Sequence, residues 1–125
     1  MIRFYGLMAA LFISGAATAH EMTPTYPKLE PSYMDGIKKA TVTVFNRRED
    51  VSYYEFGVFT QDWKPLVFAT ENRILRLEYL EKKTVDVYLR DRDAKNATYI
   101  CTRSKILKGS DTTSLVASVI CSKIK

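Results

Sequence analysis

Apolar and polar residues alternate along much of the chain from residue 40 onward. Ala40, Val42 and Val44 are separated by Thr41 and Thr43, a period of two that is typical of a half-buried β-strand. Similar apolar or alternating stretches follow at short intervals, with turn-forming residues between them. The predicted strands are residues 40–45, 52–60, 66–68, 74–80, 84–90, 99–106 and 114–123, of which residues 74–80 also fit one turn of helix.

The same alternation predicts which side chains enter the core. In residues 52–60, Tyr54, Phe56 and Val58 share one face of the strand, because successive side chains of a strand point to opposite sides. The corresponding face of residues 84–90 carries Val85, Val87 and Leu89. About seven short strands, turns between them and no amphipathic helix predict an antiparallel β-sandwich.

The N-terminal residues have the pattern of a secretory signal peptide. Arg3 precedes an apolar core at residues 7–13, and Ala17-Thr18-Ala19 fits the small-residue pattern that signal peptidase cleaves. A membrane anchor is the alternative, but this core falls short of the roughly 20 apolar residues that span a bilayer. We therefore predict cleavage after Ala19, one domain at residues 20–125, and a periplasmic or secreted location without stable membrane insertion.

The two cysteines fit both the topology and this compartment. A hairpin centred on Asp111 places Cys101 directly opposite Cys121. In a non-hydrogen-bonded antiparallel pair, facing Cα atoms lie about 4.5 Å apart, which is within reach of a disulfide bond. Two buried free thiols are the alternative, but an oxidising compartment favours the disulfide.

Composition and charge narrow the classes of partner. The 125 residues are 46% hydrophobic and 26% charged, which is typical of one globular domain. The formal net charge is +5 at pH 7, but the basic residues are spread along the chain and mostly lie near acidic ones. Nucleic-acid binding needs a concentrated basic stripe, so we expect no nucleic-acid partner.

No pattern in the sequence points to catalysis. It has neither a G-x-S-x-G motif nor a Gly-rich phosphate loop, and His20 is its only histidine. Both cysteines are assigned to a disulfide, so a thiol nucleophile is not expected. We therefore predict a protein that is not an enzyme and needs no cofactor.

The predicted mature N-terminus begins with His20 and is a candidate metal site. Its α-amine and imidazole can chelate Cu(II), and Met22 can add a thioether ligand for Cu(I). Two nitrogens make a weak site compared with a closed set of ligands. An exposed terminus without metal is therefore the favoured interpretation, and a periplasmic copper-binding carrier is kept as the alternative function.

Three stretches of the sequence are similar to a known family. Residues 40–50, ATVTVFNRRED, resemble the second strand of the N-terminal domain of periplasmic pilus-assembly chaperones. Residues 74–90, ILRLEYLEKKTVDVYLR, are similar to a later segment of that domain, and Tyr99-Ile100-Cys101-Thr102 resembles the ending of its sixth strand. The resemblance implies an all-β, antiparallel Ig-like β-sandwich, encoded by a bacterium or a phage.

The chain also departs from that family. Pilus chaperones have a second Ig-like domain, so we expect a single-domain relative here. Residues 114–123 are apolar on both faces, which favours a buried strand of the sandwich over a strand donated to a client.

These observations predict a non-catalytic binding or assembly module. Its partner is expected to be a protein of the cell envelope, a surface appendage or a virion, bound by strand pairing at a sheet edge. Tyr53, Phe59 and Trp63 are the candidate contacts, because exposed aromatic residues often anchor interfaces. A half-buried packing role is the alternative for these three side chains.

Overall fold

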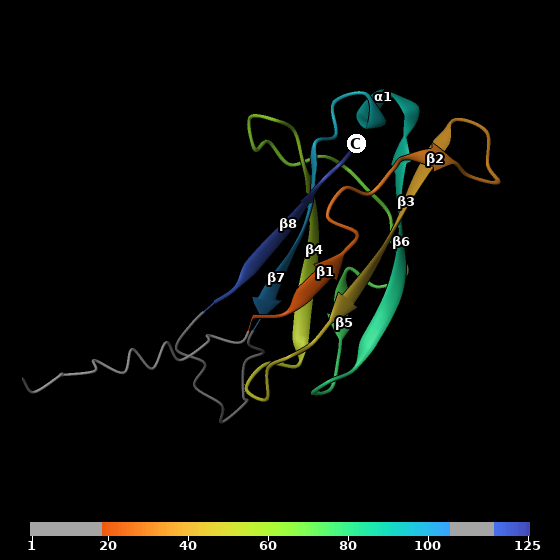
Figure 1. The fold of residues 1–125 in the computed structure, drawn as a ribbon. Coiled ribbons are helices and arrows are strands. Elements are labelled where there is room, and N and C mark those ends of the chain that lie inside the picture. Colours follow the sequence, from red (N-terminus) through yellow and green to blue (C-terminus); the bar gives the residue numbers. More distant parts are fainter. Residues whose placement is uncertain (1–18, 106–116) are drawn as a thin grey trace, which may run out of the picture.

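The computed structural model describes residues 19–105 and 117–125. Most of the predicted signal peptide and the turn around Asp111 therefore lie outside the described residues. In the described part of the chain, two four-stranded sheets enclose a shared apolar core (Figure 1). Every strand pair in them is antiparallel. This confirms the predicted antiparallel Ig-like β-sandwich.

The first sheet, sheet A, is built around one long strand pair. β3 (Ile37–Phe45) pairs along its whole length with β6 (Lys82–Arg90). The other edge of β3 carries two short strands, β1 (Glu21–Thr23) and β2 (Glu30–Pro31). Gly36 occupies the turn before β3 with a φ of 80°, a conformation that glycine adopts without steric cost.

The second sheet, sheet B, has the strand order β5-β4-β7-β8. Its strands are β4 (Tyr53–Phe59), β5 (Ile74–Arg76), β7 (Tyr99–Lys105) and β8 (Val119–Lys123). A single helical turn, α1 (Asp91–Ala94), connects β6 to β7. In the described ranges, no helix has the length and apolar character needed to cross a membrane.

The core consists largely of the side chains that the alternation predicted to face inward. Tyr54, Phe56 and Val58 of β4 are each at most 1% exposed. The predicted inward face of β6, formed by Val85, Val87 and Leu89, is also buried. Each fully buried side chain of this kind stabilises the fold by roughly 1.5–3 kcal/mol relative to an exposed one. The prediction of both inward faces is confirmed.

The strand predicted at residues 66–68 is not formed. Instead, the chain crosses there from sheet B to sheet A and makes one isolated bridge to each. The Leu66 N–H donates to the Val58 carbonyl at 2.8 Å, whereas Ala69 exchanges two hydrogen bonds with Tyr88 of β6. A segment that passes from one sheet to the other cannot run alongside one strand for several residues. Its apolar residues therefore pack without forming a continuous series of backbone hydrogen bonds to a neighbouring strand.

Two other predicted strands differ from the expectation. Of residues 74–80, only Ile74–Arg76 form a strand, and the chain then turns with Leu80 at a φ of 63°. The last strand was predicted to be buried on both faces, but Val119 is 54% exposed. The reason is that Val119 pairs with the exposed Arg103 and, like it, points away from the core to the outer face of sheet B.

The N-terminal segment joins the two sheets at one side of the sandwich. β1 pairs with β3 in sheet A, and a cis Thr23–Pro24 peptide bond follows it. Beyond that bond, the Thr25 carbonyl accepts a hydrogen bond from the Lys123 N–H at 3.1 Å. The residues that follow β1 thereby lie beside β8 of sheet B.

Candidate functional site on the outer face of sheet B

The outer face of sheet B is formed by the residues that alternate with its core positions. The pairing register aligns these residues in rows that run across β4, β7 and β8. One row contains Gly57, Cys101 and Cys121, and the neighbouring row contains Glu55, Arg103 and Val119. We call this surface, together with the segment 65–73 beside it, the sheet-B face.

The disulfide bond lies in the middle of the sheet-B face. Cys101 and Cys121 are directly opposite each other and are bonded, with Cα atoms 4.0 Å apart. The Ser104 N–H donates to the Ser118 carbonyl, so the hydrogen-bonded pairs are the even-numbered ones. The cysteine pair is consequently the non-hydrogen-bonded kind. The predicted disulfide and its register are both confirmed.

A groove of about 390 Å³ opens on this face beside β4. Its floor includes Gly57 and Cys101, and Phe59, Leu66 and Val119 supply apolar walls. A Cβ atom at Gly57 would lie 2.8 Å from the ring of Phe59, so the ring lies over a position that has no side chain. A glycine inside a strand commonly marks such a close approach.

An aromatic group occupies one end of the sheet-B face. Phe59 and Tyr99 face each other across β4 and β7. The indole of Trp63 stacks on Tyr99 with ring centroids 4.1 Å apart and an interplanar angle of 1°. Trp63 is nevertheless 55% exposed, and its φ of 62° lies in the left-handed region. The turn holds it there through a hydrogen bond from its N–H to the Thr60 carbonyl at 3.0 Å.

Charged side chains occupy the opposite end. The Lys105 ammonium donates to the Glu55 carboxylate at 2.5 Å. This hydrogen bond is the main cause that holds the pKa of Glu55 below its usual value, and the charges of Lys105, Arg73 and Arg103 act in the same direction. Arg73 also lies over the ring of Phe68, 5.1 Å from its centroid.

The structure places the three predicted contact residues in two different places. Phe59 and Trp63 lie together, with ring centroids 6.2 Å apart. Tyr53 is at the other end of β4, where it faces Arg76 on one side and Lys105 on the other. Phe59 and Tyr53 are half-buried and only Trp63 is exposed.

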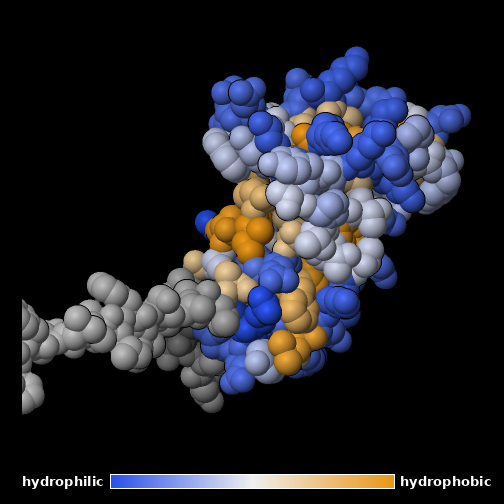
Figure 2. All heavy atoms as spheres, in the orientation of Figure 1, coloured by the Kyte–Doolittle hydropathy of each residue, from blue (hydrophilic) through white to orange (hydrophobic). Residues whose placement is uncertain are grey.

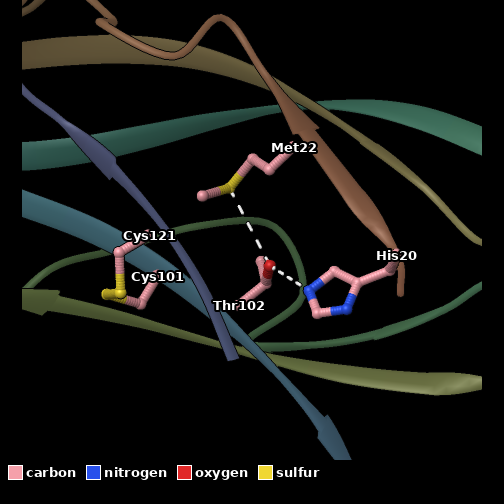
Figure 3. The surroundings of a disulfide bond; sticks show 5 residues. All are labelled: His20, Met22, Cys101, Thr102 and Cys121. Atoms are coloured by element: carbon pink, nitrogen blue, oxygen red, sulfur yellow. Dashed lines mark hydrogen bonds between the residues drawn. A yellow bond between two sulfur atoms is a disulfide. The ribbon is translucent and has the colours of Figure 1, made fainter. Parts of the chain in front are cut away.

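His20 is buried between the two sheets, which corrects the expectation of an exposed terminus. It is 1% exposed, and its Nε2 atom lies 2.7 Å from the hydroxyl of Thr102 (Figure 3). Its Nδ1 atom lies 2.9 Å from the hydroxyl of Ser118. Its ring contacts Tyr54, with centroids 4.4 Å apart. Removal from water lowers the pKa of His20 to about 4.

Met22 enters the same buried cluster from the next inward position of β1. The Thr102 hydroxyl donates to the Met22 sulfur at 3.9 Å (Figure 3). That hydroxyl has one proton, so Nε2 of His20 is the donor in the bond that they share. Among the residues that the structure describes, no group of three His, Cys, Asp or Glu side chains is placed to hold a metal ion.

Sequence reasoning missed a second buried polar cluster, centred on Asn46. Its amide donates to the carbonyls of Val51 and Leu77 at 2.8 Å and 2.9 Å. Its oxygen accepts from the Tyr54 hydroxyl at 2.5 Å and from the Arg48 N–H at 2.9 Å. Burial raises the pKa of Tyr54 to about 12, so the phenol remains a donor. The only signal in the sequence was the position of Asn46 at the end of an alternating run.

The sheet-B face therefore offers exposed aromatic area, an apolar groove and fixed charges, which are the elements of a recognition surface. The two polar clusters are internally hydrogen-bonded, and none of the buried side-chain polar atoms in the described ranges lacks a partner. Such satisfied clusters fix the core arrangement.

In the comparison with known proteins, no family model matches the chain and no curated protein matches it.

Proposed function

We propose that the protein is a non-catalytic binding or assembly module that acts in the periplasm or outside the cell. Its partner is a protein of the envelope, of a surface appendage or of a virion, and the sheet-B face makes the contact. The disulfide supports an oxidising compartment. The observation that carries the proposal is the conformation and exposure of Trp63.

Trp63 stands where the backbone favours glycine. The left-handed conformation costs a residue with a Cβ roughly 1–2 kcal/mol, and the indole is still 55% exposed. Stacking on Tyr99 recovers roughly 0.5–1.5 kcal/mol beyond the area that it buries, but the exposed part of the indole contributes nothing to folding. A rigid, half-exposed indole is well suited to anchor a protein interface.

The edge of β8 supports the same proposal. Val119 is 54% exposed, and hydrophobic colour gathers over β8 in the space-filling view (Figure 2). Among the described residues, Lys123 has a backbone partner on this edge, whereas Val119 and Cys121 have none. An edge strand of this kind can pair with a strand of a partner.

Site-specific photo-crosslinking in the cells that produce the protein tests this function. A photoreactive phenylalanine derivative replaces Trp63 or Val119, and a matched variant carries it at Tyr79, which is 50% exposed but lies outside the sheet-B face. We expect one protein adduct that forms at positions 63 and 119 and not at 79. Equal labelling at all three positions, or no adduct at the first two, would refute the proposal.

The copper-carrier hypothesis has one observation in its favour. The side chains of His20 and Met22 converge on the same Thr102 hydroxyl, and an imidazole with a thioether is a ligand pair that suits Cu(I). Both imidazole nitrogens are engaged in hydrogen bonds, however, so a metal ion would have to displace a hydroxyl. Cu(I) uptake that disappears in His20→Ala and persists in Thr102→Val would favour this second function, and equal weak uptake would exclude it.

A further inference from the structure

The groove on the sheet-B face carries positive charge that the described residues do not balance. Arg73 and Arg103 both line it and both are exposed. Neither forms an ion pair with any described carboxylate. Glu55 is the only acidic residue among the described residues that line the groove, and it is already bound to Lys105. The two guanidinium groups are therefore available to a ligand.

Both arginines are held at defined places on the groove. The Arg73 carbonyl accepts a hydrogen bond from the Phe56 N–H at 2.9 Å, and its guanidinium lies over Phe68. Arg103 faces Glu55 across the strand pair β4–β7. Arg73 and Arg103 both contribute to the lowered pKa of Glu55, which means that their fields overlap in this part of the groove.

The rest of the groove is apolar. Phe59 and Leu66 form one wall, with the Phe59 ring lying over Gly57, and Val119 lies on the β8 side. A ligand that fills this space needs negative groups close to aliphatic ones. Guanidinium groups bind carboxylates through paired, charge-assisted hydrogen bonds, and apolar walls accept the aliphatic side chains that flank them.

We propose that the groove binds an acidic, extended segment of a protein partner, with its carboxylates on Arg73 and Arg103 and its apolar side chains against Phe59 and Leu66. This inference rests on the proposed function and adds the chemistry of the partner to it. A nucleic acid fits less well, because two arginines beside a carboxylate do not form the continuous basic stripe that a phosphate backbone needs.

Fluorescence anisotropy with a defined peptide tests the proposal. The probe is a labelled Glu-Val-Glu-Val-Glu-Val peptide with blocked ends, compared with Lys-Val-Lys-Val-Lys-Val at low ionic strength. We expect the acidic peptide alone to bind, and the double variant Arg73→Gln/Arg103→Gln to weaken it by at least about tenfold. The control Lys82→Gln/Arg92→Gln removes the same charge from exposed positions away from the groove and should bind as the wild type does.

Several results would overturn the inference. They are binding of both peptides alike, no binding of the acidic peptide, and equal losses in the two double variants. Tighter binding of phosphatidylglycerol vesicles or of a single-stranded oligonucleotide, lost in the same Arg73/Arg103 variant, would replace the acidic segment with another polyanion. Circular dichroism and an intact disulfide establish that each variant is folded.

The crosslinking experiment distinguishes a failure of this inference from a failure of the proposed function on which it rests. If adducts at position 63 persist in the Arg73→Gln/Arg103→Gln background, the sheet-B face binds a partner without the arginines and the inference fails alone. If no adduct forms in any background, the proposed function fails, whatever the peptide does. Loss of the adduct only in the arginine variant supports both.

Discussion

The Nε2 atom of His20 lies 2.7 Å from the Oγ1 atom of Thr102, although 82 positions separate the two residues in the chain. The other ring nitrogen lies 2.9 Å from the Ser118 hydroxyl. One imidazole thus links the segment before β1 to β7 and to the residue that precedes β8. Burial favours the neutral ring, because no described carboxylate pairs with His20 to compensate the charge of an imidazolium.

Acidification below pH 6.5 should destabilise the protein through His20. The pKa of His20 falls from 6.5 to about 4 on folding, so the unfolded chain binds more protons between these values. Its contribution to stability is complete above pH 6.5 and is lost as the pH falls toward 4. From pH 7 to pH 5 we expect the free energy of unfolding to drop by about 2 kcal/mol, measured by urea denaturation.

His20→Gln provides the control for this prediction. Glutamine has no titrating group, so its free energy of unfolding should be nearly flat over the same interval. The lowered pKa of Glu55 acts in a separate window: its contribution is present above its unfolded pKa, near 4.5, and is lost only below that value. Identical pH profiles for the wild type and His20→Gln would show that the imidazole is not the responsible group.

The different outcomes for His20 and the disulfide show what a single sequence can predict. The Cys101–Cys121 register follows from counting outward from one turn, because hairpin pairing is local and fixed by geometry. The environment of His20 depends on Thr102 and Ser118, which are remote in sequence, and no periodicity reports on such contacts. Its position next to a predicted cleavage site favoured an exposed terminus, whereas packing against Tyr54 placed it in the core.

Removing the disulfide should lower stability without abolishing the fold. The bond closes a loop with a sequence separation of 20, and constraint of the unfolded chain by a loop of that size contributes about 3 kcal/mol. We expect the double variant Cys101→Ala/Cys121→Ala to lose about that much in urea denaturation. Adding a reductant should then have no further effect on the variant. A continued response to reductant would contradict this account.

Asn46 should be far less replaceable than Tyr54, whose hydroxyl donates to it. Asn46→Ala leaves the carbonyls of Val51 and Leu77 and the Tyr54 hydroxyl without their present partners. Buried groups stranded in this way cost about 1–3 kcal/mol each, so we expect a loss of at least about 3 kcal/mol in the free energy of unfolding.

Tyr54→Phe is the matched comparison. It removes one donor, but the Asn46 oxygen keeps its hydrogen bond from the Arg48 N–H, and the aromatic ring that contacts His20 remains. We expect a loss of about 1 kcal/mol. If the two substitutions cost the same in parallel urea titrations, Asn46 does not organise this cluster.

Inward-facing strand residues were predictable where a strand is long and its two faces differ. The alternation in β4 and β6 repeats over at least three buried positions, so solvent and core select one register. Residues 66–68 are all apolar, so their pattern does not indicate which side chains face the core. Their crossing between the sheets is fixed by backbone hydrogen bonds from the segment to Val58 and Tyr88. The sheet-B face was found only in part for a similar reason: Phe59 and Trp63 are near in sequence, whereas Tyr99 is not.

Replacing Trp63 should separate folding from binding. Trp63→Gly relieves the left-handed backbone and loses the stack on Tyr99, and these opposite effects are each about 1 kcal/mol. It also loses the burial of the covered part of the indole, so we expect the free energy of unfolding to fall by no more than about 3 kcal/mol, together with loss of the partner adduct formed through position 119. Trp63→Val has the backbone cost without the stack, so it should be clearly less stable than Trp63→Gly. The reverse order would show that the left-handed backbone at position 63 carries no such cost.

Gly57→Ala should change the groove more than it changes stability. The new Cβ atom would lie 2.8 Å from the Phe59 ring, and because those ring atoms are at the far end of a side chain, the ring can move aside. Alanine also restricts the unfolded chain more than glycine does, which offsets part of the cost. We expect a free energy of unfolding within about 1 kcal/mol of the wild type, an altered Trp63 fluorescence spectrum and weaker binding of the acidic peptide. An alanine that leaves both the spectrum and the binding unchanged would show that the Phe59 wall does not shape the groove.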